Sequence, residues 1–292
     1  MKTRAGRDLL SVEDLSAQEL MKLFSLADRL KGKRTDALKS KNIVMIFQKP
    51  STRTKVSFEV AISQLGGNAI SLNWNELQLG RGETVEDTAK VLERYADAII
   101  ARVFSHGDLE KMAAAASIPV INALSDLEHP CQAIADLYTI RQGKKKFKGL
   151  RIAFLGDCKN NTFRSLALAA WKLSMNIVFS CPADYRPDIA GARIEENPMN
   201  AVKDADIIYT DTFVSMGDEA EKDRRLADLE TYRLNTRLVQ AAKKGVMVMH
   251  PLPAHRGVEI ESKVMDSRNS VVFDQAENRL HTEKAILKFL LG

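Results

Sequence analysis

Short apolar runs rich in valine and isoleucine recur along the chain and alternate with segments in which apolar residues repeat at the helical period. Near-continuous apolarity over roughly four to eight residues is typical of parallel strands buried on both faces. The alternation continues to the end of the sequence, so it predicts an α/β fold built from βαβ units. The predicted strands are residues 43–47, 69–72, 98–103, 119–124, 150–157, 176–180, 205–211, 246–250 and 271–274.

Helix boundaries can be read between these strands. Ser16 and Glu19 form an S-x-x-E capping box ahead of an amphipathic run. A second helix is expected to begin near Thr52 and to end at residues 66–67, a Gly-Gly pair, because glycine readily takes the left-handed conformation that closes a helix. Residues 126–142 are expected to form a helix that bridges the two halves of the chain.

Charge and glycine interrupt the pattern at residues 141–150, RQGKKKFKGL. This segment separates four predicted strands from five, and the 292 residues exceed the commonest size of a single core, roughly 100–150 residues. We therefore expect two domains, residues 1–143 and 144–292, each a mainly parallel sheet flanked by helices. Ligands of such sheets bind beyond the C-terminal ends of the strands, so the residues that follow each strand are the candidates for a binding site.

Composition and charge restrict the class of protein. No apolar run approaches the roughly 20 residues of a transmembrane helix, and the first residues lack the apolar core of a secretory signal, so no membrane association is expected. Three cysteines without a C-x-x-C pair indicate reduced thiols and a cytoplasmic location. The net charge of +5 comes without a long basic block, so nucleic acid is not an expected partner, whereas a small anionic substrate is compatible. The five histidines show no metal-ligand spacing, and no metal is expected.

The first predicted strand is followed by QKPSTRTKVSFE. Residues 51–54, Ser-Thr-Arg-Thr, would lie at the start of a helix, where unpaired backbone N–H groups carry a partial positive charge. Hydroxyls and a guanidinium added there make a pocket suited to phosphate. An ordinary capped helix with basic surface residues explains this single motif equally well.

Two further strand ends carry unusual polar residues. Arg102 stands in a strand end that is otherwise apolar, and a buried arginine requires an anionic partner or a ligand. His129 and Gln132 flank a proline at the expected start of the bridging helix. One histidine before a proline is usually structural, but three polar strand ends in one domain favour a shared site.

The motifs STRTK, ELQLGRGE, ARV, HPCQ, TDTFVSMG, HPLPAHRG and DQAENRLH occur in this order. The chain from about residue 7 to the C-terminus thereby resembles the aspartate/ornithine carbamoyltransferase family, and within it the ornithine enzymes. The resemblance implies transfer of a carbamoyl group from carbamoyl phosphate to the δ-amine of L-ornithine, without a cofactor. It also implies a C-terminal helix that returns to the first domain, and a homotrimer or an assembly of trimers.

The resemblance also implies roles for individual residues. Arg102, His129, Thr54 and Pro251 would serve catalysis, and Gln78 would reach into the site of a neighbouring subunit. Carbamoyl phosphate would be bound by Ser51, Thr52, Arg53, Thr54, Gln78, Arg102, His129, Gln132, Pro251, Leu252 and Arg279. Ornithine would be bound by Asn161, Asp211, Ser215 and Met216.

One motif departs from the pattern of the ornithine enzymes. Those enzymes usually read H-C-L-P, whereas this chain has His250-Pro251-Leu252-Pro253, which resembles the aspartate enzymes. A proline-rich turn presents carbonyl oxygens with few competing N–H groups, so it can aim acceptors at an amine. Asp211 precedes any basic residue in its segment and would attract a diamino acid while repelling aspartate.

Alternatives to ornithine carbamoylation remain open at this point. Putrescine, N-acylated ornithine or aspartate could be the acceptor, and a non-catalytic anion-binding relative would share most of these residues. A nicotinamide-dependent dehydrogenase is disfavoured because Gly156 is followed by Asp-Cys-Lys-Asn rather than by the remaining glycines of G-x-G-x-x-G. The basic residues late in TDTFVSMGDEAEKDRR are expected to be solvated.

Overall fold

The computed structural model describes residues 7–215, 217 and 219–292. Within these residues the strands form two parallel sheets, one of four strands in the order β2-β1-β3-β4 and one of five in the order β7-β6-β5-β8-β9. The chain divides into two compact units, the first comprising residues up to Ala135 together with Glu277–Gly292, and the second Asp136–Ala276. The predicted fold class, two parallel α/β sheets flanked by helices, is confirmed.

The first unit packs helices against both faces of its sheet. Alternate strand residues such as Val44, Ile46 and Ile99 face helices that contribute Leu109 and Met112 to one apolar cluster. The elements of this unit are β1 (Asn42–Phe47), β2 (Asn68–Asn73), β3 (Ala98–Arg102), β4 (Val120–Leu124), α1 (Ala17–Leu30), α2 (Thr52–Gln64), α3 (Val85–Leu92), α4 (His106–Ala115) and the start of α5 (Pro130–Lys144).

The predicted ends of the first helices are confirmed. Ser16 accepts a hydrogen bond from the Glu19 N–H, and the Glu19 side chain accepts from the Ser16 N–H, which completes the capping box of α1. The helix α2 ends at Gln64, two residues before Gly66, which has a φ of 80°. None of the helices in the described residues is both long enough and apolar enough to cross a membrane.

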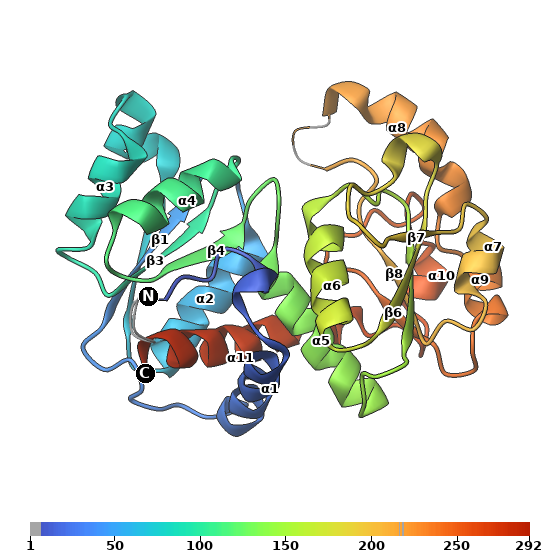
Figure 1. Cartoon of the computed structure of the whole chain (residues 1–292), viewed down its shortest axis with the longest axis horizontal. Helices are drawn as coiled ribbons and strands as arrows, with labels where there is room; N and C mark the ends of the chain where they lie inside the picture. The colour runs from blue at the N-terminus through green and yellow to red at the C-terminus, as the bar shows by residue number, and fades with distance from the viewer. Residues whose placement is uncertain (1–6, 216, 218) are drawn as a thin grey trace. The chain divides into compact units, whose positions relative to one another are not determined.

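The C-terminal helix α11 (Val272–Leu291), red in Figure 1, lies beside α1 and α2. Its fully buried Lys284 donates hydrogen bonds to the carbonyl oxygen of Leu30 at the end of α1, to that of Lys33 in the loop that follows, and to Oε1 of Gln64 at the end of α2. A helix ends with unpaired carbonyls that favour a nearby cation, so one ammonium group joins three chain segments. The expected return of the last helix to the first unit is confirmed.

The second unit also covers its sheet on both faces. On one face, Ala153 and Leu155 of β5 share an apolar cluster with α7, α9 and α10, and on the other face the Phe154 ring contacts Phe163 of α6 and Tyr209 of β8. The elements are β5 (Arg151–Leu155), β6 (Asn176–Ser180), β7 (Arg193–Ile194), β8 (Ile207–Thr210), β9 (Met247–Met249), α6 (Asn161–Lys172), α7 (Pro198–Val202), α8 (Lys222–Leu229), α9 (Thr236–Ala241) and α10 (Ser262–Met265).

Two strand predictions differ from the structure. Residues 271–274, predicted as a strand, instead begin α11 at Val272; only a single bridge, Val248 to Ser270, continues the sheet there. An apolar run of four residues fits the first turn of a buried helix as well as a strand, so the pattern alone could not distinguish them. The strand β7 was missed because its two residues are too few for a period to be recognised.

The buried ammonium of Lys284 generates a prediction about stability. Lys284→Met would leave the buried carbonyl oxygen of Leu30 without this donor, and unsatisfied buried acceptors are costly. We expect the free energy of unfolding, measured by chemical denaturation, to fall by about 2–4 kcal/mol. Lys288→Met, one turn later on the same helix and only partly buried, is the matched control. Equal losses for the two variants would contradict this role of Lys284.

Candidate functional site

The polar residues singled out from the sequence follow strands that are neighbours in the sheets. In the first unit β1 and β3 pair, with Phe47 opposite Arg102, and the chain leaves these strands toward opposite edges of the sheet. In the second unit β5 and β8 pair in the same way, with Leu155 opposite Thr210. Such switch points are where ligands bind in open α/β sheets, because the diverging connections leave a crevice.

The start of α2 lies directly beyond β1. Ser51 is the N-cap of this helix, and its hydroxyl accepts a hydrogen bond of 3.3 Å from the Thr54 N–H. Thr54 is fully buried, Arg53 is half-buried and Thr52 is exposed. The first turn contains no acidic residue, so the positive end of the helix dipole is not neutralised locally.

Three guanidinium groups and an imidazole come together near this helix start. Arg102 is the last residue of β3, His129 precedes α5, and Arg279 on α11 donates a 2.8 Å hydrogen bond to the Thr54 hydroxyl. Arg102, His129 and Arg279 are each at most 7% exposed. Segments far apart in the sequence therefore deliver cationic or polar donors to one place within the first unit.

These groups influence the protonation of one another. Burial, with the nearby charges of Arg279 and Arg53, lowers the pKa of Arg102 to about 10. Burial, and then the charges of Arg279 and Arg102, hold the pKa of His129 well below its usual value, so its imidazole is neutral at physiological pH. Burial and Arg279 also lower the pKa of Arg53. The arginines remain charged and repel one another, which favours binding of an anion.

Two hydrogen-bond donors of this cluster remain available for a ligand. Nε of Arg102 and Nε of Arg279 are buried and have no hydrogen-bond partner among the described residues. Unpaired buried donors are costly unless a ligand uses them. Gln132 lies buried in the first turn of α5, three residues after His129, whereas Gln78 is exposed at the start of a 3-10 helix, Gln78–Arg81.

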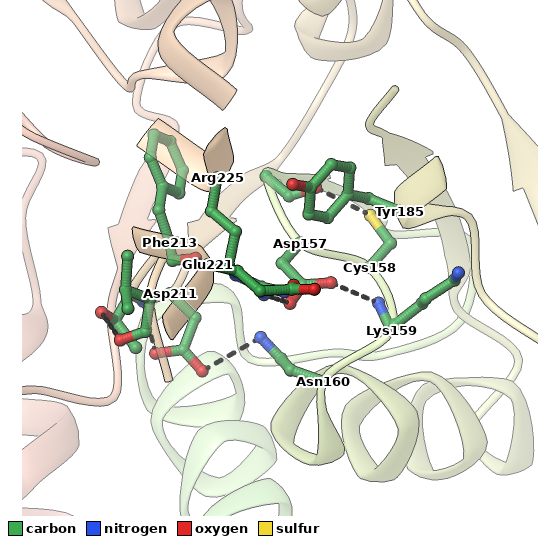
Figure 2. Close-up of polar contacts among 12 residues, drawn as sticks. Asp157, Cys158, Lys159, Asn160, Tyr185, Asp211, Phe213, Glu221 and Arg225 are labelled. Atoms are coloured by element: carbon green, nitrogen blue, oxygen red, sulfur yellow. Dashed lines mark hydrogen bonds and ion pairs between the residues drawn. The ribbon is translucent and has the colours of Figure 1, made fainter. Parts of the chain in front are cut away.

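In the second unit, Asp211 directly follows β8. Its carboxylate accepts hydrogen bonds from the Thr212 N–H at 2.7 Å and from the Asn160 amide at 3.4 Å, the latter shown in Figure 2. Asn160 caps α6, and Asn161 is the first residue of that helix. Burial raises the pKa of Asp211 to about 6, so its carboxylate is negatively charged at neutral pH.

An arginine fixes the loop that follows Asp211. Arg225 of α8 donates through Nε to the Phe213 carbonyl at 2.9 Å and pairs through a terminal nitrogen with the buried Asp157 carboxylate, as Figure 2 shows. Asp157 in turn accepts from the Lys159 N–H at 2.9 Å. The loops after β5 and β8 are thus joined through one side chain, a set of contacts that we call the Arg225 clasp.

The Phe213 ring packs closely against the backbone of Gly156. Gly156, with a φ of 111°, lies so close that a Cβ atom there would be 2.8 Å from the ring. Ser215 follows in the same loop, where the Thr212 hydroxyl donates to the Val214 carbonyl at 3.0 Å. Met216, predicted to contact ornithine, lies outside the described residues.

The HPLP turn after β9 is stabilised by His250. The backbone N–H of Leu252 donates to Nδ1 of this buried histidine at 2.9 Å, which requires Nδ1 to be unprotonated. The other ring nitrogen lies 3.2 Å from the buried Glu259 carboxylate, so the proton is on Nε2. Leu252 has a φ of 59°, which is unfavourable for a branched side chain, and precedes a cis peptide bond to Pro253.

Several residues of this arrangement were not predicted from the sequence. Arg225 belongs to a run predicted to be solvated; Arg224 in that run is exposed, but for Arg225 the prediction is wrong, because its side chain is only 10% exposed. Glu259 and Glu283 are fully buried carboxylates that were not considered. The position of Glu283 four residues after Arg279 was the one available signal, since such residues share a helix face.

Comparison with known proteins agrees with this geometry. The family model described as the carbamoyl-P binding domain of aspartate/ornithine carbamoyltransferase matches residues 7–142. The model of the Asp/Orn binding domain of the same family matches residues 148–290. Together the two matches cover nearly the whole chain.

Individual relatives match over nearly their full length. An ornithine carbamoyltransferase of Archaeoglobus fulgidus is 50% identical, with 98% of both chains covered. The solved structure of ornithine carbamoyltransferase from Pyrococcus furiosus has a TM-score of 0.92 at 48% identity, covering 98% of this chain and 97% of its own. The structure of the enzyme from Thermus thermophilus has a TM-score of 0.91 at 38% identity, covering 98% and 99%. The chain belongs to the aspartate/ornithine carbamoyltransferase family.

Proposed function

We propose that this protein transfers the carbamoyl group of carbamoyl phosphate to the δ-amine of L-ornithine, giving citrulline and phosphate in arginine biosynthesis. The observation that carries the proposal is the cluster of the half-buried Arg53 with the buried Arg102 and Arg279 at the start of α2, in a chain about half identical to enzymes of this name. A relative named as anabolic, from Pyrococcus furiosus, is 48% identical over 99% of this chain.

The first unit contains the groups needed to bind and activate carbamoyl phosphate. In our proposal, the backbone N–H groups of α2, together with Ser51, Thr52 and Arg53, bind the phosphate that leaves. Thr54, Arg102 and His129 donate hydrogen bonds to the carbonyl oxygen on which negative charge develops. Thr54 is suited to this role because its oxygen already accepts from Arg279, which leaves its own O–H free to donate. Gln132 is assigned to the carbamoyl amide.

The second unit favours a cationic acceptor. No salt bridge joins Asp211 to another described residue, so its carboxylate can hold the α-ammonium group of ornithine, assisted by Asn161, Ser215 and Met216. An aspartate acceptor would need cations for its two carboxylates. The buried Arg225 cannot serve in this way, because Asp157 and the Phe213 carbonyl occupy its guanidinium.

The HPLP turn is proposed to receive the attacking amine. Neither the Pro251 nor the Leu252 carbonyl oxygen accepts a hydrogen bond from the part of the chain that the structure describes. Because His250 holds the Leu252 N–H, the turn cannot use that donor to satisfy its own carbonyls. Backbone oxygens can therefore accept the protons of the δ-amine, in place of the thiol usual at residue 251.

Assembly and location are further parts of the proposal. We assign a homotrimer in which the exposed Gln78 of one subunit completes the carbamoyl phosphate site of its neighbour. Exposed apolar side chains on the first unit, including Val56 at 53% and Phe104 at 49%, fit a subunit interface. The three buried free thiols fit the reducing cytoplasm.

Product formation tests the activity. Purified protein with carbamoyl phosphate should convert ornithine to citrulline, detected by mass spectrometry, with far less product from putrescine, N-acetylornithine or aspartate. Asp211→Asn should lower kcat/KM for ornithine by about 100-fold, because a partly buried charge-assisted contact is lost. Asp188→Asn, at an exposed position, is the control. N-carbamoylaspartate as the main product would contradict the acceptor, and no product from any acceptor would favour a non-catalytic relative.

The Arg225 clasp generates a second kinetic prediction. Arg225→Met should raise KM for ornithine by roughly tenfold and leave KM for carbamoyl phosphate unchanged, because only the loop after Asp211 loses its contacts with the Arg225 guanidinium. The substitution also removes the guanidinium that pairs with the buried Asp157 carboxylate, so the free energy of unfolding should fall by about 3 kcal/mol.

A double variant separates the two effects. Arg225→Met with Asp157→Asn should recover part of the stability, because no buried charge remains, but should keep the raised KM for ornithine. Arg224→Met, at an exposed position next in sequence, should change neither quantity. An ornithine KM that returns to the wild-type value in the double variant would show that the clasp acts on stability alone.

A further inference from the structure

Glu283 lies next to the cationic cluster and has no role in the proposed chemistry. It is fully buried on α11, one turn after Arg279. Its Oε1 accepts a 3.1 Å hydrogen bond from the same Arg279 nitrogen that donates to the Thr54 hydroxyl at 2.8 Å. The Arg279 guanidinium therefore bridges α2 and α11, and the Glu283 carboxylate accepts one of these two hydrogen bonds.

The surroundings of Glu283 allow it to exist in two charge states. Burial raises its pKa to about 7, although the neighbouring Arg279 and Ser57 act in the opposite direction. Its second oxygen, Oε2, is buried and makes no hydrogen bond to the described residues, so it can take up a proton without breaking a contact.

The other groups that face this cluster do not change their protonation state near neutral pH. Arg53 and Ser57 come from α2, and Arg102, with a pKa of about 10, comes from β3. Of the groups beside α5, burial and Arg279 keep His129 neutral, and burial raises the pKa of the Cys131 thiol far above neutrality. Glu283 is thus the member of this set whose charge changes between pH 6 and 8.

We propose that Glu283 is a positioning residue that holds Arg279 in the carbamoyl phosphate pocket and couples binding of the phosphate dianion to uptake of one proton. The proposal rests on the proposed function for the identity of the ligand. A bound dianion interacts with Arg279 and repels the Glu283 carboxylate, so binding favours the neutral carboxylic acid. The proton comes from solvent and is carried on the carboxyl group, which releases Arg279 to the ligand.

The sign of the pH dependence follows from this coupling. Below pH 7, Glu283 is already protonated and the anion meets no opposing charge. Above pH 7, protonating the carboxylate costs free energy, so binding weakens by up to about tenfold between pH 6 and 8. At pH 7 the free protein carries about half a proton at this site, so binding should take up about half a proton.

Sulfate is a suitable probe because it remains a tetrahedral dianion across this range and is not consumed. Titration calorimetry of the full-length protein with sulfate at pH 7, in two buffers of different ionisation enthalpy, measures the protons taken up. The dissociation constant is measured at pH 6, 7 and 8 at constant ionic strength. Glu283→Gln keeps an oxygen for Arg279 but removes the charge, and Glu277→Gln, on the exposed side of the same helix, is the matched control.

We expect proton uptake and weakening with pH in the wild-type protein and in Glu277→Gln, and neither effect in Glu283→Gln. No proton uptake by the wild-type protein, or unchanged uptake in Glu283→Gln, would overturn the proposal, and the wild-type measurement decides even if that variant does not fold. Citrulline formation is assayed separately. A protein that takes up the proton with sulfate but makes no citrulline would refute the proposed function and leave the role of Glu283 intact.

Discussion

Repulsion among clustered positive charges, most of them buried, is the constraint on which the first unit depends. Arg53, Arg102 and Arg279 influence one another electrostatically, and the helix start beside them adds a partial positive charge. Such an arrangement costs stability in the free protein, where Glu283 offsets part of the charge, and a bound anion compensates it further. The return of α11 to α1 and α2 through Lys284 matters for this reason, since it places Arg279 against Thr54 from the far end of the chain.

The second unit handles charge in the opposite way. Its buried arginine, Arg225, pairs with the Asp157 and Glu221 carboxylates and donates to the Phe213 carbonyl, so it contributes rigidity rather than a free cation. Asp211 accepts hydrogen bonds from the Thr212 N–H, the Asn160 amide and the Thr162 side chain, and has no salt bridge to another described residue. The two units therefore present complementary preferences, one for an anion and one for an ammonium group, as a reaction between carbamoyl phosphate and a diamino acid requires.

The HPLP turn shows how a departure in sequence can be accommodated by local structure. Proline at residue 251 removes the usual thiol, but the turn is held by the Leu252 N–H bond to His250 and by the contact of His250 with Glu259. The backbone N–H of His250 donates to the Gln275 side-chain oxygen, and the Gln275 side-chain nitrogen donates to Asp136 and Tyr209. A continuous buried network thus sets the direction of the turn, and each of its polar groups is costly to leave unpaired.

The sequence by itself determined the alternation of strands and helices, the first helix caps and the identity of the residues at the strand ends, because these depend on period, capping chemistry and short motifs. It could not distinguish residues 271–274 as a helix start or recognise the two-residue strand β7, since four or fewer residues carry no decisive period.

Only the tertiary structure decided which charged residues are buried and with which residues they pair. Arg225 and Glu283 look like surface residues in sequence, and each became a buried partner through contact with a distant segment or a neighbouring turn. Burial and pairing are properties of the packed chain, because they depend on which elements meet, and a local pattern of residue types does not contain that information.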